Sequence, residues 1–277
     1  MRAGRGWIRA GAVCLAVGVL ASCGTDDRAS YSGGTLEELT PQSERRGREL
    51  AVEGMRLLKD ADSVRIGVDM TTAKGTQKGS LRVDRDGNCT GTFDSGPMAR
   101  GEILVVAGDG AYARYSDATL DAIVETAARR GPEVAARARQ RVGLARGKYL
   151  KLPEGSSLGS AQATGPAACD LDDFTAEMPA APKPGETFEA LDRTHRYGRD
   201  VIPVTGRQNG QRTTMYVAAE GKPYVVAVSQ VENGEAMIMR LSDYDEPVHA
   251  KAPPPDRTLD ISRFAPGGPG PGSLFEV

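Results

Sequence analysis

The sequence predicts an α+β fold in which one large, strongly curved antiparallel sheet carries helices on its concave side. Helical periodicity is present near the start and in the middle of the chain, and two longer regions alternate apolar and polar residues. Turn residues divide those regions at intervals of roughly 12 residues, which is typical of strands joined by hairpins. A half-barrel of this kind encloses apolar volume, so the fold class is compatible with a hydrophobic ligand.

The first 22 residues have the three-part shape of a secretory signal. Arg2, Arg5 and Arg9 form a positive segment, and the apolar run that follows is too short to span a bilayer. Cys23 comes directly after Leu-Ala-Ser, which resembles the bacterial lipobox, where the thiol takes a diacylglycerol and the chain is cut before it. We expect a protein anchored by lipid on Cys23 at the outer, extracytoplasmic face of a cell membrane. The alternative is a plain secreted protein in which Cys23 is incidental.

The mature chain would consist of a tether, one domain and a tail. Residues 23–35 are rich in Gly, Ser and Thr and predict a flexible tether, residues 36–262 a single domain, and residues 263–277 a disordered Gly/Pro-rich tail. Loss of the first 22 residues, with their three arginines, would leave 255 residues and change the formal net charge from −2 to −5. A mildly acidic chain is a poor candidate for nucleic-acid binding, and no other stretch is long and apolar enough for a transmembrane helix.

The first half of the domain reads as a helix followed by a meander. Apolar residues at near-helical spacing predict a helix over about residues 36–62, and the period then changes to two from Val64 to Met70. Residues 63–116 are expected to form antiparallel strands, with turns at 74–75, 86–88 and 108–110.

The second half reads as helices followed by another meander. A helical block over about residues 120–144 is interrupted at Gly131-Pro132, because proline cannot continue a helix. A short strand (148–152), a loop (154–168), a short helix (171–178) and a connector (179–185) follow. The second meander spans about residues 186–245, with turns at 208–210, 220–223 and 233–234, and residues 248–261 are extended.

Two cysteines remain in the mature domain, Cys89 and Cys169. An even pair in an oxidising compartment predicts a disulfide. Closing a loop of about 80 residues would stabilise the fold by about 4 kcal/mol in the chain-entropy model. The alternative is a pair of buried free thiols, which a mass measurement before and after reduction and alkylation distinguishes.

Several strand and turn segments together form a recognisable pattern. They are Ser63–Val68, Gly110–Tyr115, Gly147–Leu152, Met215–Glu220, Gly221-Lys222-Pro223, Leu241–Val248 and Ala252-Pro253. These segments resemble the LppX/LprG-type lipoproteins of mycobacteria and, more distantly, the LolA-like lipoprotein carriers. The resemblance covers roughly residues 45–260 and includes no catalytic fingerprint. It implies a half-barrel with helices filling its concave side, and some members hold a diacyl lipid or glycolipid between sheet and helices. The cysteine pair, the break at Gly131-Pro132 and the Pro/Gly-rich tail depart from the family.

The favoured function is that of a membrane-anchored lipoprotein that binds or hands on a hydrophobic ligand, a lipid or glycolipid, in the concave face. The alternating apolar residues of the strands are the candidate lining, although ordinary core packing is the simpler interpretation of the methionines. The candidates are Val64, Ile66, Val68, Met70, Leu81, Val83, Met215, Val226, Val228, Met237 and Met239. The alternative function is a cell-surface interaction or regulatory lipoprotein that presents the same fold to an envelope protein and holds no lipid.

Motifs of catalysis and metal binding are missing from the sequence. His195 and His249 are far apart and neither has a neighbouring cysteine or a paired acidic ligand, so we expect no metal, no cofactor and no enzymatic activity. The arginine-rich segment 129–146 reads most simply as the solvated side of a helix. Its alternative role is contact with anionic lipid headgroups.

Overall fold

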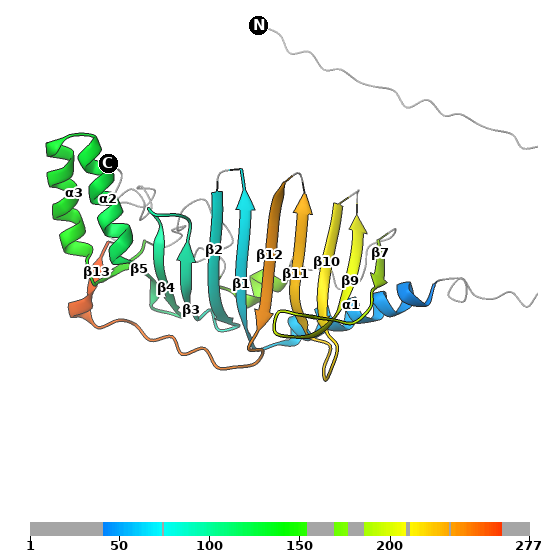
Figure 1. Cartoon of the computed structure of the whole chain (residues 1–277). Coiled ribbons are helices and arrows are strands. Elements are labelled where there is room, and N and C mark those ends of the chain that lie inside the picture. Colours follow the sequence, from blue (N-terminus) through cyan, green and yellow to red (C-terminus); the bar gives the residue numbers. More distant parts are fainter. Residues whose placement is uncertain are drawn as a thin grey trace, which may run out of the picture. The chain divides into compact units, whose positions relative to one another are not determined.

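The structure, a computed structural model, describes residues 41–73, 75–153, 169–176, 186–208, 211–232 and 234–261. The predicted signal segment, tether, tail, 154–168 loop and 179–185 connector lie outside these residues. Thirteen strands form one open, curved sheet whose order is β13-β6-β5-β4-β3-β2-β1-β12-β11-β10-β9-β7, with β8 paired to β9 (Figure 1). This sheet, with its helices, confirms the predicted α+β class.

The strands of the first meander run antiparallel to their neighbours. They are β1 (Ser63–Thr72), β2 (Gly75–Asp84), β3 (Cys89–Asp94), β4 (Arg100–Val106) and β5 (Gly110–Tyr115). The short strand β6 (Tyr149–Lys151), which follows two helices, is antiparallel to β5. The second meander is antiparallel as well. Its strands are β7 (Thr187–Ala190), β8 (Thr194–Arg196), β9 (Arg199–Gln208), β10 (Gln211–Ala218), β11 (Val225–Glu232) and β12 (Glu235–Ser242).

The pairing of β1 with β12 joins the two meanders into one sheet. The register runs from Arg65 opposite Ser242 to Thr71 opposite Ala236, so the first and last long strands lie side by side at its centre. The extended segment after β12 ends in a 3₁₀ turn, η3 (Pro255–Arg257), and in β13 (Thr258–Asp260), which pairs in parallel with β6. The sequence predicts extended chain there but does not predict this parallel pairing.

The described part of the chain has four α-helices: α1 (Gln42–Asp60), α2 (Asp117–Arg129), α3 (Pro132–Ala145) and α4 (Leu171–Ala176). The break between α2 and α3 falls where the sequence predicts it, because Gly131 adopts a positive φ of 128° and Pro132 begins the next helix. Ser116 caps α2, its side chain accepting a hydrogen bond from the backbone N–H of Thr119. None of the described helices has both the length and the apolar character that a membrane span requires.

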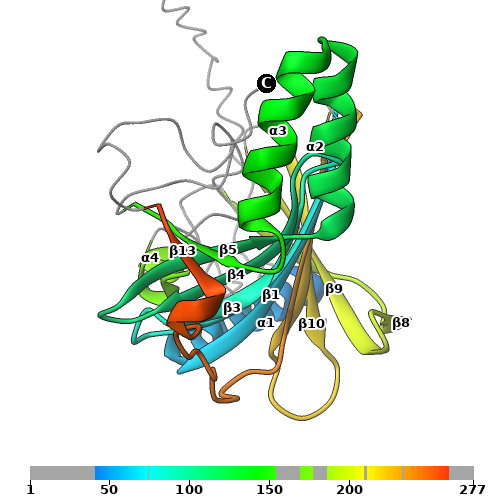
Figure 2. The same cartoon turned by 90° about the vertical axis from the view of Figure 1, so that its left-hand side faces the viewer.

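One face of the sheet, here called the inner face, packs against α1 and α4 (Figure 2). Leu58 of α1 and Leu171 of α4 belong to the same buried cluster as Ile66 of β1 and Leu81 of β2. Apolar residues of α2 and α3, including Leu120, extend this cluster towards β4 and β5. A single apolar core therefore connects all four helices to the sheet.

The first turns of α1 also contact the edge strand β7. A Cβ atom on Gly47 would lie 2.6 Å from the Phe188 carbonyl oxygen and 2.7 Å from the Ala190 nitrogen, so only glycine fits there. The backbone N–H of Leu191 donates to the Pro203 carbonyl on the β9 side. Because backbone groups alternate in direction along a strand, Phe188 and Ala190 present theirs to the free side of β7, where the helix lies.

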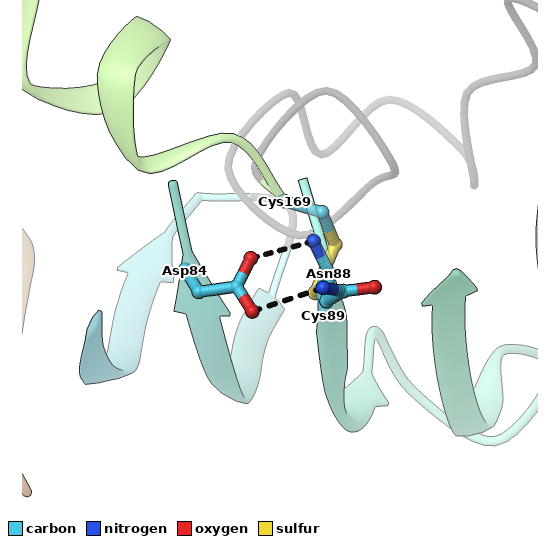
Figure 3. The surroundings of a disulfide bond; sticks show 4 residues. All are labelled: Asp84, Asn88, Cys89 and Cys169. Atoms are coloured by element: carbon cyan, nitrogen blue, oxygen red, sulfur yellow. Dashed lines mark hydrogen bonds between the residues drawn. A yellow bond between two sulfur atoms is a disulfide. The ribbon is translucent and has the colours of Figure 1, made fainter. Parts of the chain in front are cut away.

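Cys89 and Cys169 form the disulfide that the sequence predicts, with a Cα–Cα distance of 5.2 Å. Cys89 begins β3 and Cys169 lies two residues before the start of α4, so the bond fixes that helix to the sheet (Figure 3). The turn beside it is held by Asp84, whose carboxylate accepts hydrogen bonds from the backbone and side-chain nitrogens of Asn88 at 2.8 and 3.1 Å.

Replacing both cysteines, as Cys89→Ser with Cys169→Ser, should lower the free energy of unfolding by about 4 kcal/mol, because the unfolded chain regains the entropy of an open loop of about 80 residues. Urea unfolding of the double variant and the wild type measures this. Reduced wild type should approach the variant in stability, and equal stability of the oxidised wild type and the variant would contradict the prediction.

Candidate functional site

The inner face is a set of rows that cross the strands, and its two lower rows are wholly aliphatic. Here "lower" means the end at which β1 begins, as drawn in Figure 1. Val64 pairs with Val83 in the lowest row, and Ile66 lies between Leu81 and Leu241 in the next. All five side chains are buried, and they form the dry core against the helices.

The middle row contains methionine and valine side chains that are only partly covered. Cross-strand pairs place its members side by side from β1 to β9. They are, in order, Val68, Met239, Val228, Met215 and Val204. The two end members are buried, whereas the three central ones are half-buried and pack against the core from one side. This leaves flexible apolar side chains available on the inner face.

The upper row mixes methionine with polar side chains. Met70 of β1 and Met237 of β12 are direct partners, Gln77 of β2 flanks the first, and Gln230 of β11 flanks the second. Thr213 of β10 continues the row beyond Gln230. All five side chains are half-buried. Polarity thus increases along the inner face from the lower to the upper ends of the strands.

Ten of the eleven predicted lining residues lie in these rows, on one face. Val226 does not, because the register shifts between Tyr216 and Val217 and the bulge puts Val225 in the main core instead. Val226 belongs to a separate cluster with Tyr216 and Ala227. A period-two pattern cannot reveal such a bulge. The existence of a ligand cavity along the rows stays a prediction.

The sequence prediction does not include the polar members of the upper row. Gln77, Gln230 and Thr213 occupy inward positions by the same period of two that selects Met70 and Met237. The signal is therefore present in the strand pattern, but these side chains are polar, whereas the predicted lining is apolar.

The opposite, outer face carries a polar groove of about 840 Å³. Its floor is formed by neighbouring stretches of β1 to β5, and Arg240 and the start of α2 lie at its sides. Charges of both signs line it in ion pairs: Arg100 with Asp94 at 2.8 Å, and Arg240 with Asp69 at 2.8 Å. Sequence reasoning does not predict these pairs, because they depend on the register between strands.

Glu102 is a carboxylate of this groove that accepts three hydrogen bonds. Arg114 donates two hydrogen bonds to it, each 2.7 Å long, and the Tyr149 hydroxyl donates a third at 2.9 Å. Burial alone would raise the pKa of Glu102, but the hydrogen bonds from Arg114 and Tyr149 outweigh it and lower the pKa. The cluster is therefore a stable ion pair rather than a proton donor at neutral pH.

Neither histidine lies in the rows of the inner face or in the groove of the outer face. Nδ1 of His195 is 2.8 Å from Oδ1 of Asp200 on the exposed β8–β9 hairpin, and His249 is exposed on the segment after β12. Within the described ranges, no three His, Cys, Asp or Glu side chains lie close enough to hold a metal ion. Neither histidine is placed with a nucleophile in the contacts described.

The segment from Ser242 to Glu246, which carries part of the family resemblance, is a structural corner. Oδ2 of Asp243 accepts hydrogen bonds from Arg65 and Arg82 at 2.6 and 2.7 Å. The Tyr244 hydroxyl donates to the Val225 carbonyl at 2.7 Å, and the Ser63 hydroxyl donates to the Glu246 carbonyl at 2.5 Å. The corner ties the end of β12 to the start of β1, so these residues have a structural role.

Known proteins resemble this chain in structure but not in sequence. No protein-family model matches it, and no curated protein matches it. Similar solved structures include the lipoprotein LppX of Mycobacterium tuberculosis, with 12% identity and a TM-score of 0.43 over 76% of this chain and 100% of that one. LprF of Mycobacterium bovis has 14% identity and a TM-score of 0.47 over 76% and 97%. A LolA superfamily protein of Nitrosomonas europaea has 10% identity and a TM-score of 0.29 over 78% and 96%.

These structures carry the names of the families that the sequence resembles. At such identities and TM-scores, they bear on the fold at most, and no ligand or partner is taken from them.

Replacing Asp243 by Asn should lower the free energy of unfolding at neutral pH by about 1–2 kcal/mol, because two charge-assisted hydrogen bonds weaken. Burial would raise the pKa of Asp243, but hydrogen bonds from Arg65 and Arg82 lower it, so the stabilisation is present above the unfolded-state pKa of about 3.9 and is lost as pH falls through the folded-state pKa. Urea unfolding at neutral pH and near pH 3 should show a difference that shrinks in acid. A difference independent of pH would mean that packing, not charge, holds the corner.

Proposed function

We propose that this protein is an exported lipoprotein, anchored through lipid on Cys23, that binds a hydrophobic ligand, a lipid or glycolipid, against the inner face of its sheet. The observation that carries the proposal is the patch of half-buried methionine and valine side chains, Met239, Val228 and Met215, beside Met70 and Met237. Methionine is flexible and polarisable, and such side chains adapt to apolar ligands of irregular shape.

The position of the patch supports the same proposal. The helices cover the lower rows, so the core is complete there without the methionines. Met70, Met215 and Met239 above them pack on the core from one side and remain partly open on the other. A lipid chain lying on this patch would remove apolar area from water, and this burial would stabilise the complex by about 25 cal/mol for each Å².

The anchor fits this function if the ligand is handled at the membrane surface. A tether keeps the domain near the bilayer, where amphiphiles are concentrated, and it allows local exchange rather than long-range carriage. Chloroform–methanol extraction of the protein purified from membranes, followed by mass spectrometry, should recover lipid in a defined ratio to protein.

A second candidate function, an interaction lipoprotein without lipid, is favoured by the charged groove of about 840 Å³ on the outer face. The two functions use opposite faces of the sheet. Variants of the inner-face methionines distinguish them, because only lipid binding should respond.

Changing Met215 and Met239 to Gln should reduce the co-purified lipid at least fivefold, because the amides replace apolar contact with groups that lose hydration on ligand binding. The change Met98→Gln, on an exposed turn residue, is the control and should leave lipid content unchanged. Thermal unfolding checks that the variants stay folded at the temperature of purification. Lipid-free wild type, or equal lipid in all three proteins, would overturn the proposal.

Changing Cys23 to Ser should prevent lipidation and move the protein from the membrane fraction to the soluble fraction, because two or more acyl chains are needed for stable anchoring. Mass spectrometry of the N-terminal peptide of the wild type should show a diacylglycerol adduct on Cys23. An unmodified Cys23 in a membrane-free protein would support the plain secreted alternative.

A further inference from the structure

The upper row of the inner face contains a buried acceptor that no group in the described part of the chain satisfies. Oε1 of Gln77 is buried and has no hydrogen-bond partner among these residues, and the residues opposite and beyond it in the row are Met70 and Met237. A buried acceptor without a partner costs free energy, so such groups are rare in folded proteins and call for an explanation.

The other unpartnered atom of this kind in the described part of the chain differs in its surroundings. It is Nε of Arg82. The same guanidinium donates hydrogen bonds from Nη2 to Asp243 and Glu246. Arg82 therefore lies in a network of charges, whereas the amide of Gln77 lies at the end of an apolar patch. Oε1 of Gln77 is itself covered, but its neighbours in the row, Met70 and Met237, are half-buried and flexible, so a ligand that displaces them could bring a donor to it.

We infer that the inner face binds an amphiphile, with its acyl chains on the methionine row and a hydroxyl donated to Oε1 of Gln77. This rests on the proposed function and specifies its ligand: an acylglycerol-type lipid with a free hydroxyl rather than a fully esterified or purely hydrocarbon molecule. The increase in polarity towards the upper row sets the direction of binding. The polar end lies near Gln77, Gln230 and Thr213, and the chains point towards the aliphatic lower rows.

Two soluble probes test the inference: dioctanoylglycerol, which has one free hydroxyl, and its acetate ester, which has the same chains and no donor. Isothermal titration of the full chain should show that the wild type binds dioctanoylglycerol about tenfold more tightly than the ester, as expected for one hydrogen bond to a buried acceptor. Gln77→Leu should reduce that preference to less than twofold, mainly by weakening the binding of dioctanoylglycerol.

The control is Gln140→Leu, which makes the same chemical change on an exposed position of α3 and should keep the wild-type preference. Without ligand, Gln77→Leu should unfold at the same temperature as the wild type or higher, because it removes an unsatisfied acceptor. That result separates a loss of recognition from a loss of fold.

The outcomes distinguish a failure of hydrophobic binding from a failure of the Gln77 contact. If the wild type binds neither probe, the proposed function fails. If it binds both probes equally, or if Gln77→Leu keeps the preference, the inference about Gln77 is overturned while hydrophobic binding on the inner face stands.

Discussion

The pairing of β1 with β12 is the contact on which the rest of the structure depends. The two meanders are each built from neighbours in sequence, and either alone would leave an unpaired central edge and half of an apolar face. Pairing Arg65 with Ser242, and the residues that follow, turns them into one continuous sheet. The ion pairs of Asp243 close the corner at the end of this pairing, and the methionine patch exists only because β1, β12, β11 and β10 lie side by side.

Local patterns account for most of what the sequence predicts correctly. The alternation from Val64 to Met70, the turn before Cys89 and the break at Gly131-Pro132 depend on neighbouring residues, and the structure has each of them. The parallel pairing of β13 with β6 depends on a partner far along the chain, and the bulge at Tyr216 depends on the register within one hairpin, so period and turn chemistry could not reveal them. The disulfide lies between these cases: compartment and cysteine number predict it, but its place beside α4 requires the fold.

The candidate site divides in the same way. The apolar residues of β1 and β2 could be assigned to one face because a strand alternates strictly, and ten of the eleven predicted lining residues share that face. The position of Gln77 relative to Met237 could not be predicted, since it requires the registers of two strand pairs together. Nor could the ion pairs of the outer groove, which join charges on different strands.

The fit of α1 against β7 has a consequence for the solution behaviour of the protein. An open sheet presents unpaired backbone groups at its edges, and an uncovered edge is a template for pairing with another molecule. Gly47 lets the helix backbone approach the outward-facing groups of Phe188 and Ala190 too closely for another strand to enter. A single hydrogen atom in place of a side chain thus helps to keep copies of the protein from polymerising through this edge.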